Sequence, residues 1–219
     1  MDSALVLQQV TNAVREIDLE CRSLVNGIEC GLINVRKEFR ALAHEQTGKK
    51  LTEETLIAWL VRQKLNRQLS NIEWEKPYPR NQRRKCDLVF PLGKSNFLWL
   101  ELKLAWKAWF ECIKGPIVSN PSFLSYLHGL NKTHSFRHDF EKLSGSHIPS
   151  TDSRAICLIG FESLKSPMES DVRKIVSQHP DWSLANETAW IDRRCNAFQI
   201  HVWNWLMRQE SAAVSSFDL

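Results

Sequence analysis

Three charged residues lie within two otherwise apolar stretches of the sequence. Asp87 interrupts the apolar run 86–90, and Glu101 and Lys103 close the apolar run 97–103. The turn-forming residues between the two runs predict a hairpin. Because side chains alternate between the two faces of a strand, Glu101 and Lys103 are expected on one face. The sequence therefore predicts two carboxylates and one ammonium group at one end of a sheet.

This combination of charges suits metal-dependent chemistry. Unpaired charges are costly to bury, and a hard cation between the two carboxylates of Asp87 and Glu101 offsets that cost. Carboxylate oxygens suit Mg²⁺ or Mn²⁺, and Lys103 would then orient a metal-bound water or help to deprotonate it. The alternative is structural, with Asp87 in a turn and Glu101 and Lys103 paired on an exposed strand face. Apolar neighbours on both sides of the two charges favour the active-site interpretation.

A helix that precedes the two runs offers a further acid. Thr52 is a plausible N-cap, and Glu53 and Glu54 follow it in the first turn. At about 100° per residue, Glu54 lies about 20° from Val61 on the buried stripe of that helix, and Glu53 lies about 80° away. Both acids could simply complement the helix dipole. If one of them is a metal ligand, the prediction is Glu54.

A basic cluster immediately precedes the predicted hairpin. Arg80, Arg83, Arg84 and Lys85 are four basic residues in six positions, and Lys107 follows the second apolar run. Such a cluster can be a solvated loop. The functional interpretation is contact with nucleic-acid phosphates, which adds affinity without reading sequence.

Composition and cysteine usage set the broad class. The chain has 219 residues, 43% of them hydrophobic, and a net charge of +4, which is enough apolar material for a core and only mildly basic. No C-x-x-C pair is present among the six cysteines and no apolar stretch approaches a membrane span. His134 and His138 share a helix face, yet no third ligand accompanies them, so no zinc site is predicted. We expect a cytoplasmic protein with reduced thiols.

The predicted elements describe helices followed by a mixed α/β region. Helices are expected within the first fifty residues, with a turn at 27–31, and over 52–69, 134–143 and 168–178. Strands are expected over 71–78, 86–90, 97–103, 155–161 and 197–205, and 114–132 is expected to be an irregular insertion. This order predicts helices packed on a mixed central sheet. Residues 1–49 are expected to be an N-terminal helical extension, 50–208 one domain, and 209–219 a flexible tail.

The motif Asp87…Glu101-x-Lys103 on two adjacent strands, after a helix with an acid in its first turn, resembles the PD-(D/E)xK nuclease superfamily. Residues 139–143 resemble the helix after the motif strand, and 155–161 resemble the next core strand, so the resemblance covers about residues 50–205. Cys86 stands where the family name has proline, a position that varies in the family.

The resemblance implies a restriction-endonuclease-like fold and a Mg²⁺-dependent endonuclease, with Mn²⁺ able to substitute. Glu54, Asp87 and Glu101 would hold one or two metal ions and Lys103 would serve the attacking water in phosphodiester hydrolysis. DNA is the expected substrate, in restriction, defence or repair, and RNA is an alternative. A homodimer or partner contact is expected at the N-terminal helices. The rival interpretation is a catalytically silent nucleic-acid- or protein-binding module on the same fold.

Overall fold

The computed structural model describes residues 1–22, 32, 37–110, 117–129, 135–145, 147–191 and 195–208. Its helices are α1 (Ser3–Arg22), α2 (Lys37–Thr47), α3 (Glu53–Leu65), α4 (Phe123–His128), α5 (Phe136–Ser144) and α6 (Glu169–Val176). Its strands are β1 (Glu73–Tyr78), β2 (Asn81–Pro91), β3 (Phe97–Trp106), β4 (Ala108–Phe110), β5 (Ile117–Ser119), β6 (Ser153–Ser163), β7 (Trp182–Ile191) and β8 (Phe198–Met207).

Six strands form one mixed sheet in the order β1-β2-β3-β6-β8-β7. Only the central pair, β3 with β6, is parallel; the other neighbours are antiparallel. β4 and β5 form a separate two-stranded sheet. The predicted mixed α/β architecture and the hairpin between the two apolar runs are therefore confirmed.

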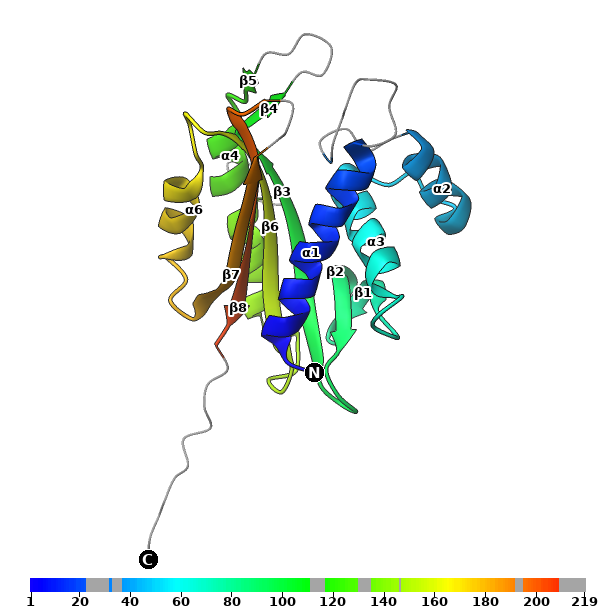
Figure 1. Cartoon of the computed structure of the whole chain (residues 1–219). Coiled ribbons are helices and arrows are strands. Elements are labelled where there is room, and N and C mark those ends of the chain that lie inside the picture. Colours follow the sequence, from blue (N-terminus) through cyan, green and yellow to red (C-terminus); the bar gives the residue numbers. More distant parts are fainter. Residues whose placement is uncertain are drawn as a thin grey trace, which may run out of the picture.

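Helices cover both faces of the sheet, and each face has its own apolar core (Figure 1). Even-numbered residues of β3, such as Leu100 and Leu102, pack in the core beneath α1 and α3. The odd-numbered Trp99 packs on the opposite face with Phe136 and Phe140 of α5. Burial on both faces explains why β3 and β6 have near-continuous apolar sequences.

Helix α1 is tied to the sheet by buried polar groups as well as by its apolar stripe. Thr11 and Asn186 both accept hydrogen bonds from Asn204 Nδ2 at 2.8 Å, and Asp18 accepts one from Trp190 Nε1 at 2.9 Å. The helix thus shares the core of the sheet, while the boundary placed at residue 49 stays a prediction. No helix in the described part of the chain is long and apolar enough to cross a membrane.

Several expected boundaries are wrong, and the causes are physical. The basic residues 81–85 continue β2, because pairing with β1 extends the strand past its apolar part. The described part of the insertion 114–132 contains β5 and α4. β7 was not predicted, because it lies at the sheet edge and its side chains are only partly buried.

The spacing of apolar residues in the first helix predicts Leu5 on its buried stripe, but the side chain of Leu5 is 53% exposed. After the turn, the sequence predicts a second helix over about 32–44; the helix α2 spans Lys37–Thr47. The predicted turn at 27–31 lies outside the described residues. Cys86, Cys157 and Cys195 are free thiols, in agreement with the reduced state expected from the sequence.

Candidate active site

The candidate site begins where β2 and β3 separate. Their ladder ends at Leu88 opposite Leu100, so the next N–H groups along that edge of β3 lack a strand partner. Side-chain carboxylates accept from them instead. Asp87 Oδ2 accepts from Leu102 N–H at 2.8 Å, and Glu54 Oε2 accepts from Leu104 N–H at 3.2 Å. Backbone donors that need acceptors therefore fix two acids at the fork.

Glu101 and Lys103 lie on the α5 side of β3, as strand alternation predicts. Glu101 is 3% exposed, and its Oε1 accepts hydrogen bonds from the Tyr78 hydroxyl and from Lys142 Nζ, the latter at 2.6 Å. Lys103 is 5% exposed, and its Nζ lies 3.2 Å from Glu54 Oε1. The three motif residues and the helix acid thus meet in one charged cluster, in which Glu101 and Lys103 are buried and Asp87 and Glu54 are partly buried.

The structure distinguishes between the two acids at the start of α3. Thr52 caps the helix by accepting from Thr55 N–H, which sets the rotation of the first turn. Glu54 then points to Lys103, whereas Glu53 pairs with Arg40 at the surface at 3.2 Å. Glu54 is accordingly the acid at the cluster, in line with its place on the buried stripe.

Helix α5 contributes two charged residues that the motif analysis did not assign to the site. Asp139 Oδ2 lies 3.4 Å from Lys103 Nζ, and Lys142 pairs with Glu101. A signal for Asp139 was available, because it falls between Phe136 and Phe140 on the buried stripe of α5. An acid on such a stripe needs a buried partner, but the sequence does not name that partner.

Two tyrosine hydroxyls complete the cluster. Tyr78 donates to Glu101, and Tyr126 of α4 donates to Glu54 Oε2 at 3.2 Å. Burial raises the pKa of both phenols, and the nearby acids add to the shift. Both therefore remain hydrogen-bond donors, and nothing in their sequence context indicated this role.

The acids of the cluster repel one another. Burial raises the pKa of Asp87 well above its usual value, and the charges of Glu101 and Glu54 raise it further. Burial likewise raises the pKa of Asp139 to about 7, against the opposing effect of Lys103. Both shifts reflect the cost of holding several carboxylates in one buried place.

The two lysines stay charged. Burial by itself would lower the pKa of Lys103, but the carboxylates of Asp139 and Glu54 outweigh burial and raise it. The pKa of Lys142 is raised in the same way by Glu101. With every group ionised, the four acids and two lysines carry a net charge of −2.

The donor chemistry of the cluster fits a hard divalent cation. All four acids offer oxygen, they outnumber the two lysines, and Asp139 Oδ2 is buried without a hydrogen bond from any described residue. In the arrangement present, no three His, Cys, Asp or Glu side chains of the described chain are close enough together to hold a metal. Instead, the ammonium groups of Lys103 and Lys142 form ion pairs with the carboxylates.

The predicted nucleic-acid contacts fall into two places. Three of them are exposed on β2: Arg83, Arg84 and Lys85. Burial lowers the pKa of His147, and the positive charge of Arg84 lowers it further, so Arg84 lies near His147. Since the His147 ring also packs edge-on against Tyr78, this basic strand lies beside the acidic cluster. Arg80 is exposed at the β1–β2 turn.

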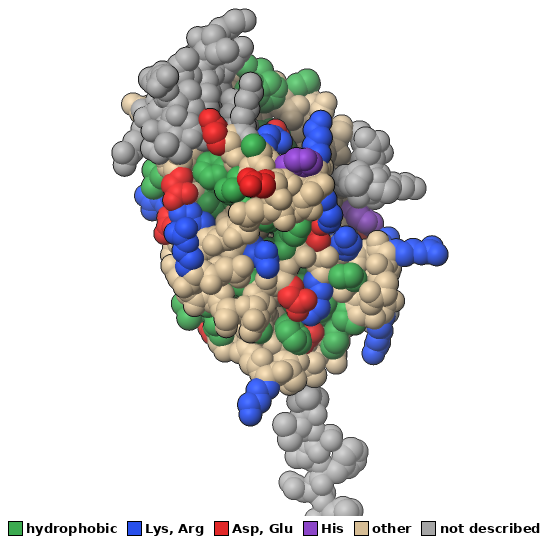
Figure 2. All heavy atoms as spheres, turned by 90° about the vertical axis from the view of Figure 1, so that its right-hand side faces the viewer, with side chains coloured by type: hydrophobic (Ala, Val, Ile, Leu, Met, Phe, Trp, Pro, Cys, Tyr) green, Lys and Arg blue, Asp and Glu red, His purple; other side chains and the backbone are tan. Residues whose placement is uncertain are grey.

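Lys107 is engaged by α6 instead. Its Nζ pairs with Asp171 at 2.8 Å and donates to the Pro167 carbonyl at 2.8 Å. Over the side of the molecule that carries α2 and α3, basic and acidic side chains are interspersed (Figure 2). The basic strand of β2 is thus the more accessible candidate for phosphate contact.

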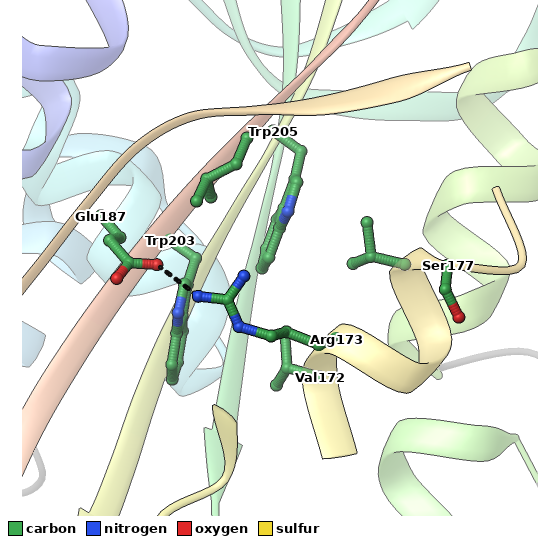
Figure 3. Close-up of a pocket in the computed structure, with 8 residues that line it drawn as sticks. Val172, Arg173, Ser177, Glu187, Trp203 and Trp205 are labelled. Carbon is green, nitrogen blue, oxygen red and sulfur yellow. Dashed lines mark ion pairs between the residues drawn. The ribbon is translucent and has the colours of Figure 1, made fainter. Parts of the chain in front are cut away.

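A pocket of about 230 Å³ lies elsewhere, between α6 and the strands β7 and β8. Trp203 and Trp205 form its floor, and Arg173 reaches across to pair with Glu187 at 3.6 Å (Figure 3). None of the predicted site residues lines it. Of the two histidines that share a predicted helix face, His134 lies outside the described residues, and His138 Nδ1 lies 3.7 Å from Glu141 Oε2.

Comparison of the chain with models of known protein families, with curated proteins and with solved structures gave no match.

Proposed function

We propose that this protein is a metal-dependent nuclease with a restriction-endonuclease-like fold that hydrolyses DNA phosphodiester bonds. The order of elements supports the fold assignment. Helix α3 precedes the meander β1-β2-β3, α5 follows it, and β6 then pairs in parallel with β3. This is the succession that the sequence resemblance implied around the motif.

One observation carries the functional proposal. Asp87, Glu101 and Lys103 come from two strands and gather at the β2–β3 fork with Glu54, in a largely buried cluster whose four acids outnumber its two lysines. A purely structural role would not require four acids to be held together against their mutual repulsion. Perturbed acids of this kind are characteristic of functional sites.

The described residues have distinct roles in this proposal. Tyr78 and Lys142 fix one oxygen of Glu101, and Leu102 N–H fixes one oxygen of Asp87. Lys103 stays protonated, so it acts as a fixed positive charge that orients water and phosphate and not as a base. The chemistry supplied by a bound Mg²⁺ would be stabilisation of charge on the phosphate and acidification of a water. An endonuclease role in restriction, defence or repair, as the resemblance implies, fits this machinery.

The exposed basic strand supports nucleic acid as the substrate. Arg83, Arg84 and Lys85 project from β2, the strand that also carries Asp87. Contacts between these residues and phosphates would place the nucleic-acid backbone beside the acidic cluster. Such contacts do not distinguish DNA from RNA, so both are tested.

The test is cleavage of supercoiled plasmid, linear duplex, single-stranded DNA and RNA with Mg²⁺, Mn²⁺ or EDTA. Asp87→Asn and Lys103→Met are expected to lose at least about 100-fold in rate, the scale on which removal of charge-stabilising groups acts. Asp171→Asn, which removes an acid away from the cluster, is the matched control and keeps full activity. Equal cleavage by all variants would assign the activity to a contaminant and refute the proposal.

A second candidate is a catalytically silent nucleic-acid-binding module on the same fold. The observation that favours it is that Lys103 and Lys142 already neutralise part of the acidic cluster. It predicts nucleic-acid binding without cleavage, and binding that is independent of divalent cations and of Asp87→Asn.

A further inference from the structure

The two acids nearest to Lys103 differ in how far their oxygens are already used. Glu54 has both oxygens engaged: Oε1 faces Lys103 Nζ, and Oε2 accepts from Leu104 N–H and from the Tyr126 hydroxyl. If Glu54 turned toward a cation, the Leu104 N–H would lose its acceptor at the strand fork. Glu54 is therefore held in place as a support for β3 and Lys103.

Asp139 is in the opposite situation. Its side chain is 9% exposed, and its Oδ2 accepts no hydrogen bond from any residue that the structure describes. Lys103 Nζ lies 3.4 Å from this oxygen, so the oxygen points into the cluster. A buried acceptor without a hydrogen bond calls for an explanation, and an ion that binds there is one.

Asp87 and Glu101 each have one carboxylate oxygen that is available for a ligand. Asp87 uses Oδ2 for Leu102 N–H, and Glu101 uses Oε1 for Tyr78 and Lys142. The Oδ1 of Asp87 and the Oε2 of Glu101 receive no hydrogen bond within the described chain. A carboxylate with one oxygen fixed and the other available is an oriented ligand.

We propose that Asp139 of α5, together with Asp87 and Glu101, supplies the ligands for the divalent cation, and that Glu54 is a positioning residue that holds Lys103 and the edge of β3. The proposal rests on the proposed metal-dependent function and departs from the ligand set that the motif alone predicts. Cation binding requires these three carboxylates to approach one another, and the attraction of a divalent cation would offset their mutual repulsion.

The test exploits the preference of soft ligands for soft metals. A loss of affinity alone does not distinguish a ligand from a residue that orients one, since outer-shell changes also weaken metal binding by about 10–100-fold. Replacing a ligand carboxylate with a thiolate, by contrast, shifts the preference from Mn²⁺ toward Cd²⁺. Calorimetric titrations of Mn²⁺ and Cd²⁺ into the full chain would compare Asp139→Cys, Glu54→Cys and the wild type. The wild type gives the baseline ratio of Cd²⁺ to Mn²⁺ affinity, including any contribution from the native thiol of Cys86.

Asp139→Cys is expected to raise the Cd²⁺/Mn²⁺ affinity ratio at least about tenfold over the wild type, and Glu54→Cys to leave it within about twofold. A shift at position 54 and not at 139, or at neither, overturns the proposal while leaving the metal-dependent function in place. If the wild type binds no divalent cation, the metal-dependent function fails with it. If Asp139→Cys does not fold, Asp139→Asn is compared with Glu54→Gln in Mn²⁺ titrations, and a greater loss at position 54 overturns the proposal.

Discussion

The carboxylate of Asp139 is buried among like charges, and we expect this to have a measurable cost in stability. Burial and the charges of Glu101 and Glu54 outweigh the attraction of Lys103 and raise the pKa of Asp139 from its usual 3.8 to about 7. The folded protein therefore binds a proton that the unfolded chain has already released between these pH values. Its free energy of unfolding must then fall as the pH rises through this range.

The size of the effect follows from the same two pKa values. At about 1.4 kcal/mol for each pH unit, the loss between pH 3.8 and about 7 is roughly 4 kcal/mol. Asp139→Asn keeps the shape of the protonated acid and does not ionise. We expect the variant to equal the wild type near pH 4 and to be more stable at pH 8 by up to about 4 kcal/mol.

The assay is urea unfolding in EDTA at pH 4.5, 6 and 8, with the free energy of unfolding taken from the linear extrapolation. Asp171→Asn is the control, because Asp171 forms a half-buried pair with Lys107 at 2.8 Å; we expect a loss of up to about 1 kcal/mol that is similar at pH 6 and pH 8. The reasoning is refuted if Asp139→Asn is less stable than the wild type at pH 8, or if the difference between the two does not change with pH.

Two further predictions concern the lysine of the motif and the basic strand. Lys103→Met leaves two acids without their cation and should lower the free energy of unfolding by about 3–5 kcal/mol at pH 8; because the raised pKa of Lys103 keeps it charged well above neutral pH, the loss should persist at pH 7, and urea curves that differ by under about 1 kcal/mol would contradict it. Replacing Arg83 and Arg84 with Ala should weaken binding to a labelled duplex and reduce the slope of log K against log salt by about 0.9 for each phosphate that the protein no longer neutralises. Fluorescence anisotropy in EDTA measures this against Arg137→Ala, a surface change on α5, and an unchanged slope would remove the strand from the interface.

Local patterns in the sequence were enough to predict much of the fold. Thr52 is the N-cap of α3 because a hydroxyl before two acids satisfies the first backbone donors of a helix. The apolar runs containing Asp87 and Glu101 became neighbouring strands, since apolar residues on both faces require a central place in a sheet. The helical period also identified Glu54, and not Glu53, as the acid that faces inward.

Other parts depended on interactions between segments far apart in the chain. β2 extends through its basic residues because β1 pairs with it there. β7 forms at the sheet edge because its backbone hydrogen-bonds to β8. Neither the basic segment 81–85 nor β7 has a strong apolar period of its own. Hydrogen bonding to an existing strand can stabilise a segment whose side chains remain largely in water.

Some members of the charged cluster could likewise be predicted from the sequence, whereas others depended on the tertiary structure. The sequence by itself determined that Glu101 and Lys103 would share one face of a strand and that Asp87 would lie on the neighbouring strand, since strand period and a short turn are local properties. Glu101 and Lys103 lie within β3, which continues to Trp106, and not at the end of the sheet as the sequence predicted. Only the tertiary structure decided that Asp139 and Lys142 of α5 and the hydroxyl of Tyr78 would join them. Which buried partner an acid on a helix stripe meets depends on how that helix packs across the sheet, and that packing is set by the whole core.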